Sequence, residues 1–302
     1  MKKTVGMLLA MLLVISICSG CAHREDQGND PAPVPPPEQG NDVPSGTGGD
    51  ETKTDIPEGP DWSGWDITEQ SSASETFRGR YLVISTITSD ITAYDGEENS
   101  ITLIKAQYPV MTAVSGSPEG YENIAAFYSN DHREQADSFI AENCMDLIGI
   151  AASSADNGES FSPVTYCETC EIIREDERIL SVLTVRTIGS GSGETGTIVT
   201  GENYDISNGT RITLEDMVSD LGKLYGLMAS ELRNDPDLEL TMDEYSLTLS
   251  LNANIGDIPF TVGKDGLNFY ISPEYLGMQE GKDVTLSLKS AALEGMIDPR
   301  YR

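Results

Sequence analysis

Residues 22–75 contain too few apolar side chains to build a hydrophobic core, and this confines any fold to the rest of the chain. The segment is rich in proline, glycine and acidic residues. Such a composition favours an extended, self-repelling chain with an end-to-end distance of roughly 40 Å or more. We therefore interpret residues 21–75 as a disordered acidic tether. An alternative for the run PAPVPPPEQ within it is a polyproline ligand for a partner's groove.

The tether follows an amino terminus typical of an exported protein. Two lysines precede an apolar run from Val5 to Ile17, which spans roughly 20 Å as a helix, whereas a bilayer core is about 30 Å thick. Ser19-Gly20-Cys21 resembles the lipobox of bacterial lipoproteins, in which the cysteine is lipidated before cleavage. We predict that residues 1–20 are a lipoprotein signal peptide and that Cys21 anchors the protein to the outer face of the bacterial cytoplasmic membrane. The alternative is an ordinary signal with an incidental cysteine.

Residues 76–195 predict a first α+β unit. FRGRYLVISTITSDITAY and NSITLIKAQYPVM alternate apolar and polar residues and favour two strands joined across DGEE. From Tyr121 the apolar residues recur at three- and four-residue steps and indicate a helix; its apolar stripe contains Ala136, Phe139, Ile140, Cys144, Leu147 and Ile148. SPVTYCETCEII and ERILSVLTVRTI then predict two more strands. The expected order is strand, strand, helix, strand, strand.

Residues 196–302 predict a second α+β unit after the glycine-rich segment GSGSGETG. Asn208-Gly209 indicates a turn, and Thr213, three residues before Asp216, indicates a helix cap. The helix is expected from Leu214 to about Leu232, ending before Asp235-Pro236. YSLTLSLN, IPFTVG, GLNFYIS and DVTLSLK predict four strands, with Lys264-Asp265-Gly266 as a turn. The predicted fold class is therefore α+β, with mainly antiparallel sheets and one long helix in each unit.

The second unit resembles the carboxy-terminal domain of RsiV-type anti-sigma factors and of the amino-terminal region of some peptidoglycan deacetylases, known as DUF3298. The residues that carry the resemblance are Asp205, Gly209, Leu214, Asp216, Phe260, Gly266, Leu267 and Phe269. The first unit, with Tyr108-Pro109 ahead of its helix, is similar to the DUF4163 domain found upstream in these proteins. Both resemblances rest on structural motifs and identify no catalytic residues.

The resemblance implies a binding module outside the cell. In the anti-sigma relatives this region is a receptor for lysozyme. A deacetylase would need a further catalytic domain, which we do not expect here. An anti-sigma factor would need a cytoplasmic segment and a true membrane span, and we expect neither of these two. The expected function is therefore that of a non-catalytic binding lipoprotein for a wall component or a cationic lysozyme-like protein. Two alternatives stay open, an accessory envelope protein that packs against another membrane protein and a wall hydrolase that uses carboxylates.

The charge of the chain agrees with a cationic partner. The sequence contains 50 acidic and 19 basic residues, a net charge of −31. Such a chain repels nucleic acid and anionic lipid headgroups and attracts cationic proteins by steering that salt weakens. The alternative is that the acidity serves solubility alone.

Few residues offer catalytic or metal-binding chemistry. His132 is the only histidine after the tether, and its polar surroundings SNDHREQAD favour a solvated position on the helix. The acidic segment DGEEN lacks the spacing of a calcium loop. The sequence therefore predicts no catalytic residue, no metal site and no cofactor.

Three cysteines lie beyond the tether. Cys167 and Cys170 form CETC within strand-like sequence, so their side chains should face opposite ways and cannot bridge each other. Because an exported protein can form disulfides, we predict that Cys144 pairs with whichever of the two faces inward. The alternative is three reduced, partly buried thiols.

Overall fold

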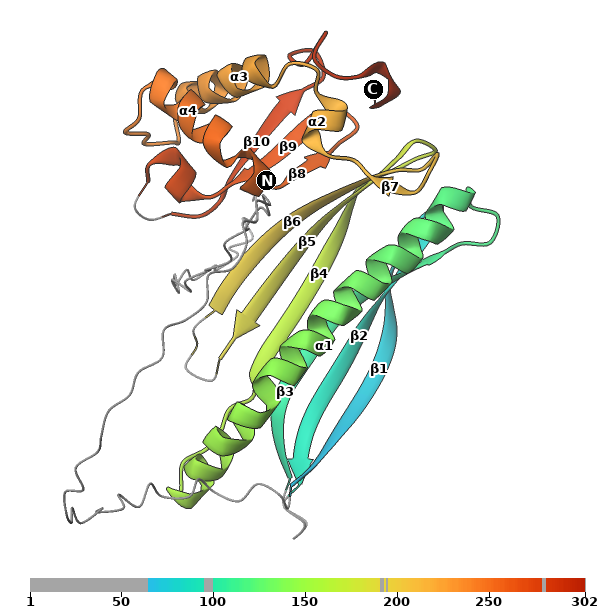
Figure 1. Cartoon of the computed structure of the whole chain (residues 1–302), viewed down its shortest axis with the longest axis vertical. Helices are drawn as coiled ribbons and strands as arrows, with labels where there is room; N and C mark the ends of the chain where they lie inside the picture. Colours follow the sequence, from blue (N-terminus) through green and yellow to red (C-terminus); the bar gives the residue numbers. More distant parts are fainter. Residues whose placement is uncertain (1–64, 95–99, 191–192, 194, 279–280, 302) are drawn as a thin grey trace, which may run out of the picture. The chain divides into compact units, whose positions relative to one another are not determined.

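The strands of the large sheet lie side by side in the order in which they follow along the chain (Figure 1). The computed structural model describes residues 65–94, 100–190, 193, 195–278 and 281–301. The signal peptide, Cys21, most of the tether and the DGEE turn lie outside these residues. The sheet contains β1 (Asp66–Arg78), β2 (Leu82–Tyr94), β3 (Ser100–Ala113), β4 (Val164–Glu175), β5 (Ile179–Gly189), β6 (Thr195–Asp205) and β7 (Thr210–Arg211).

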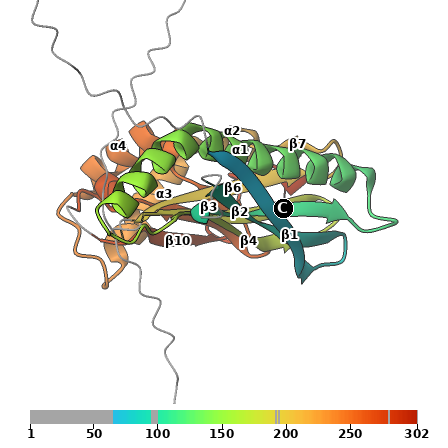
Figure 2. The ribbon, with the colours of Figure 1, turned by 90° about the horizontal axis from the view of Figure 1, so that it is seen from below.

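One long helix, α1 (Glu119–Asp156), connects the single parallel pair of described strands, β3 and β4. The other neighbouring strands are antiparallel. A parallel pair needs a long crossover, and α1, about 57 Å long at 1.5 Å per residue, provides it while packing against β3. Figure 2 shows the helix running over the strands. The predicted order of strand, strand, helix, strand, strand is confirmed for β2, β3, α1, β4 and β5.

Two apolar clusters lie beneath α1, one under each half of the helix. The first contains Tyr121, Ile124 and Tyr128 together with buried residues of β2 and β5. The second contains the predicted apolar stripe, including Ala136, Cys144, Leu147 and Ile148, with residues of β3 and β4. The stretch of helix between the two clusters carries His132.

A smaller antiparallel sheet, in the order β10, β9, β8, forms the core of the carboxy-terminal part. Its strands are β8 (Phe260–Val262), β9 (Gly266–Ile271) and β10 (Val284–Lys289), with helices α2 (Leu214–Met217), α3 (Leu221–Asn234) and α4 (Glu244–Asn254) and the short 3-10 helices η1 (Ile255–Asp257), η2 (Pro273–Leu276) and η3 (Pro299–Tyr301). The last three predicted strands and the turn at Gly266 are confirmed. The α+β fold class is also confirmed.

Strand β8 lies against the large sheet through specific polar contacts. The backbone N–H of Val262 donates to Ser181 Oγ at 2.9 Å and to Asn203 Oδ1 at 3.0 Å. Asn203 Nδ2 donates to the carbonyl oxygen of Phe260 at 2.9 Å. A Cβ atom at Gly201 would lie 2.0 Å from the same oxygen, so a glycine is required for this approach. These contacts hold the two sheets together.

The folded region begins earlier than predicted. Strand β1 starts at Asp66 and pairs with β2 along its length, so residues 66–75 belong to the sheet and not to the tether. All 13 side chains of β1 are exposed. Because backbone hydrogen bonds rather than buried side chains hold this edge strand, no hydrophobic pattern marks it in the sequence.

The boundary predicted between residues 195 and 196 does not separate two sheets. The glycine-rich segment connects β5 to β6, which pair from Ile179 with Asp205 to Gly189 with Thr195. All described residues belong to one compact unit.

The helix predicted from Leu214 to Leu232 is two helices. The cap at Thr213 is confirmed, because its side chain and that of Asp216 form a reciprocal capping box at the start of α2. Val218 then adopts an extended conformation and forms a β-bridge with Ile297. Asp220 caps the start of α3 by accepting from the backbone N–H of Lys223. As predicted, α3 ends before Asp235.

The segment YSLTLSLN is helix α4 rather than a strand. Leu247 and Leu251, four residues apart, are fully buried, whereas Leu249 between them is 50% exposed. Asp243 caps the helix by accepting from the backbone N–H of Ser246 at 2.7 Å. An alternating S-L-T-L-S-L pattern contains leucines four residues apart as well as two apart, so it is compatible with both structures.

Candidate functional site

His132 lies on the buried face of α1, which corrects the prediction of a solvated histidine. Its side chain is 4% exposed. Nδ1 lies 2.8 Å from Oε2 of Glu168 on β4, and Nε2 lies 3.2 Å from Oε2 of Glu202 on β6. Tyr128 and Ala136, one turn before and after His132, are both fully buried. Residues four apart lie on the same face of a helix, so the spacing of Tyr128, His132 and Ala136 indicates that His132 is buried. The polar residues next to His132 in the sequence hid this signal.

The two carboxylates are held by further donors. Arg186 Nε donates to Oε1 of Glu168 at 2.5 Å, and the hydroxyl of Tyr204 donates to Oε1 of Glu202 at 3.0 Å. We call His132, Glu168, Arg186 and Glu202 the buried polar cluster. Each charged group in it faces a group of opposite charge, as buried charges require.

The electrostatics of the buried polar cluster favour a protonated histidine. Burial by itself lowers the pKa of His132, but the hydrogen bonds and charges of Glu168 and Glu202 outweigh it and raise the pKa to about 9. Burial raises the pKa of Glu168, but His132 and Arg186 hold it below its ordinary value. Two cations and two carboxylates then balance one another. Because Glu168 is 0% exposed and Glu202 3% exposed, neither carboxylate faces solvent where a substrate could approach.

One group of described residues has the composition of a metal site. The potential ligand atoms of Asp131, His132 and Glu202 lie within 4.8 Å of one another. A tetrahedral zinc site, with bonds of about 2.0–2.1 Å, brings its ligand atoms to about 3.4 Å from one another. Both ring nitrogens of His132 already face carboxylates. The arrangement therefore fits a protonated histidine better than a metal ion.

The three cysteines are free in the structure, and the predicted bridge is not formed. CETC lies within β4, as predicted. Cys170 is the inward-facing residue, but it packs against the cluster that contains Tyr128, whereas Cys144 belongs to the other cluster. Tyr128 and Cys144 are about 24 Å apart along α1. Cys167 points to the opposite face of the sheet from Cys170. Burial raises the pKa of Cys170 to about 11, so this thiol stays protonated.

The solvent-facing half of α1 is acidic. Glu134, Asp137, Glu142 and Asp146 are all exposed, and none of them forms an ion pair with another described residue. Arg133 is the single lysine or arginine of the helix. The first and last of these acids are about 18 Å apart along the helix. We call these four residues the acidic row.

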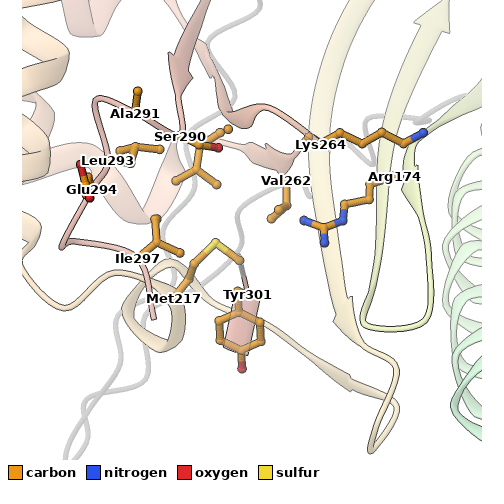
Figure 3. A pocket seen from close by; sticks show the side chains of 13 residues that line it. Arg174, Met217, Val262, Lys264, Ser290, Ala291, Leu293, Glu294, Ile297 and Tyr301 are labelled. Atoms are coloured by element: carbon orange, nitrogen blue, oxygen red, sulfur yellow. The ribbon is translucent and has the colours of Figure 1, made fainter. Parts of the chain in front are cut away.

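A cavity of about 400 Å³ lies at the carboxy-terminal sheet (Figure 3). Its walls are mainly apolar and come from α2, β8, β9 and the segment after β10. Arg174 of β4 also lines it. No residue singled out in the sequence lies in this cavity except Gly266, Leu267 and Lys264 of the β8–β9 turn region.

Among the described residues, no helix is long and apolar enough to cross a membrane.

Comparison with known proteins identifies the fold. No family model matches the sequence, and no curated protein does. A DUF3298 family member from Bacteroides fragilis aligns with a TM-score of 0.50 and 14% identity over 78% of this chain and 94% of that chain. A DUF3298 family protein from Pseudomonas aeruginosa aligns with a TM-score of 0.39 and 9% identity over 78% and 95% of the two chains.

The class that the structure defines is an α+β protein with two sheets and one long crossover helix. More particularly, its fold is similar to that of the Bacteroides DUF3298 family member, nearly all of which is matched. This agrees with the DUF3298 part of the resemblance seen in the sequence. The DUF4163 and RsiV-type parts of that resemblance stay predictions.

Proposed function

We propose that this protein is an exported, non-catalytic binding lipoprotein that captures a cationic, wall-associated ligand. Its anchor is the lipidated Cys21, and its site of action is the outer face of the cytoplasmic membrane. A lysozyme-like protein is the ligand that the sequence resemblance favours. The proposal has no role for a cofactor or for nucleic acid.

The observation that carries the proposal is the acidic row on α1. Four exposed carboxylates without ion-pair partners give this side of the protein a local negative field, which attracts a basic partner and raises its association rate. Carboxylates already engaged in ion pairs would contribute less to this negative field. His132, Glu168 and Glu202 of the buried polar cluster, by contrast, are closed to solvent and suit a stabilising role.

Binding of the full-length protein to immobilised lysozyme tests the proposal. We expect saturable binding at low ionic strength that weakens at least tenfold near 1 M salt, where the Debye length is about 3 Å. Salt-independent binding, or none at low ionic strength, would contradict the lysozyme-like ligand. Release of muropeptides from purified wall would contradict the non-catalytic assignment. Acylation at Cys21 is tested separately, by mass analysis of the mature amino-terminal peptide.

A second candidate function is suggested by α4. Tyr245 and Leu249, four residues apart, are 73% and 50% exposed and form an apolar strip on the helix. Such a strip suits an accessory protein that packs against another envelope protein. Co-purification of a membrane protein that is lost on Leu249→Glu, with no binding to lysozyme, would favour this function.

A further inference from the structure

The cavity beside the carboxy-terminal sheet has walls formed by buried side chains. Met217, Val262, Leu267, Leu293 and Tyr301 are each at most 7% exposed and all line the space. Its volume of about 400 Å³ lies within the range of small-molecule sites, roughly 300–1,000 Å³. Figure 3 shows Met217, Val262, Leu293 and Tyr301 around a common space, with Arg174 on the side of the large sheet.

Arg174 is the one strongly polar group buried at this cavity. Its side chain is 9% exposed, and its Nε donates to Oδ2 of Asp176 at 2.5 Å. The two Nη atoms make no hydrogen bond to any described residue. Figure 3 shows the guanidinium directed from β4 toward the apolar walls. Neither Nη is a fully buried atom without a partner, so both reach open space, where an acceptor that enters the cavity can pair with them.

The charges that line the cavity favour an anion. Lys264 lines the rim next to Arg174, and Glu294 is the single acidic residue among those that line it. An excess of positive lining groups stands out in a chain with a net charge of −31. The two Nη atoms of an arginine match the two oxygens of a carboxylate, because the planar guanidinium donates in parallel to both.

We propose that this cavity binds a small molecule or chain end with a carboxylate head and an apolar body. The carboxylate accepts from the Nη atoms of Arg174, and the body packs against Met217, Leu267 and Leu293. An acyl acid and the carboxy terminus of an apolar peptide share this chemistry. The site is separate from the acidic row, so the proposal is independent of the proposed protein ligand.

Calorimetric titration of the full-length protein with octanoate and with N-acetyl-leucyl-leucine tests the inference. We expect one-to-one binding of at least one of these acids, and at least tenfold weaker binding of its uncharged amide. Binding of octanoate alone identifies an acyl acid as the ligand class, and binding of the dipeptide alone identifies a peptide end. No binding of either acid, or equal binding of acid and amide, would overturn the proposal.

Two variants locate the site. Arg174→Gln should weaken binding of the acid at least tenfold, so that the acid no longer binds more tightly than the amide. Arg178→Gln changes an exposed arginine outside the cavity and should leave the affinities for acid and amide unchanged. Ala291→Trp changes an exposed lining residue and should block acid and amide alike without disturbing the core. Unchanged affinity in Ala291→Trp, or in a folded Arg174→Gln variant, would place binding elsewhere and overturn the proposal.

Discussion

Nδ1 of His132 lies 2.8 Å from Oε2 of Glu168, and this ion pair bridges α1 to β4. The two apolar clusters under the helix lie on either side of it. The buried polar cluster therefore links α1 to the sheet between the two apolar clusters. Its contribution to the free energy of unfolding can be measured by changing the charge of its residues, through pH or by substitution.

Stability should fall as pH rises through about 9. The pKa of His132 is raised from an ordinary value of 6.5 to about 9, so the folded state binds this proton more tightly than the unfolded state does. The resulting stabilisation, about 3 kcal/mol, is fully present below about pH 6.5 and is lost through about pH 9. Urea unfolding between pH 6 and pH 10 measures it. His132→Gln should be less stable at pH 6 and should lose this pH dependence; an unchanged profile would contradict the assignment.

Removing one carboxylate of the buried polar cluster should be costly. Glu168→Gln leaves Arg186 and His132 without their shared anion, and breaking a buried pair in this way costs about 3–5 kcal/mol. Glu171→Gln, on the same strand but exposed, is the matched control and should change the free energy of unfolding by less than about 0.5 kcal/mol. Equal effects of the two substitutions on the denaturant midpoint would contradict the ionic role of Glu168.

Gly266 should not tolerate a side chain. It has φ 153°, and a Cβ atom there would lie 1.9 Å from the carbonyl oxygen of Leu288. Gly266→Ala forces β9 and β10 apart and should cost at least about 2 kcal/mol. Gly256→Ala meets nothing within 4 Å and serves as control. Thermal unfolding compares the two, and a Gly266→Ala variant as stable as the control would refute the close contact.

All three cysteines of the described region should be free thiols. Cys144 and Cys170 belong to different apolar clusters, and Cys167 faces away from Cys170. Alkylation of the denatured, unreduced protein should label each of the three without prior reduction. Peptides that become labelled only after reduction would restore the bridge predicted from the sequence.

Elements whose buried side chains follow a clear period could be predicted from sequence alone. The stripe from Ala136 to Ile148 identified α1, and alternation identified β2, β3, β4 and β5. Strand β1 could not be found in this way, because backbone pairing holds it and all its side chains are exposed. In α4, leucines at every second position satisfy both a strand and a helix, and the packing of Leu247 and Leu251 decides between them.

The candidate sites depended on contacts between distant segments and were less predictable. His132, Glu168 and Glu202 come from a helix and two strands, and only the fold brings them together. Arg174 was not singled out in the sequence, because nothing local indicates that its strand meets the walls formed by Met217 and Leu293. The acidic residues of α1 could be read from the sequence, whereas the absence of ion pairs at the acidic row, among the described residues, required the structure.

The most direct test of the proposed function is charge reversal on the acidic row. Glu134→Lys, Glu142→Lys and Asp146→Lys together should lower the association rate and the affinity for immobilised lysozyme at least tenfold at low ionic strength. The control, Glu231→Lys, Asp237→Lys and Glu239→Lys, makes the same change in net charge at exposed positions elsewhere and should have less than a threefold effect. Equal loss in both triple variants, or no loss in the first, would contradict recognition through α1.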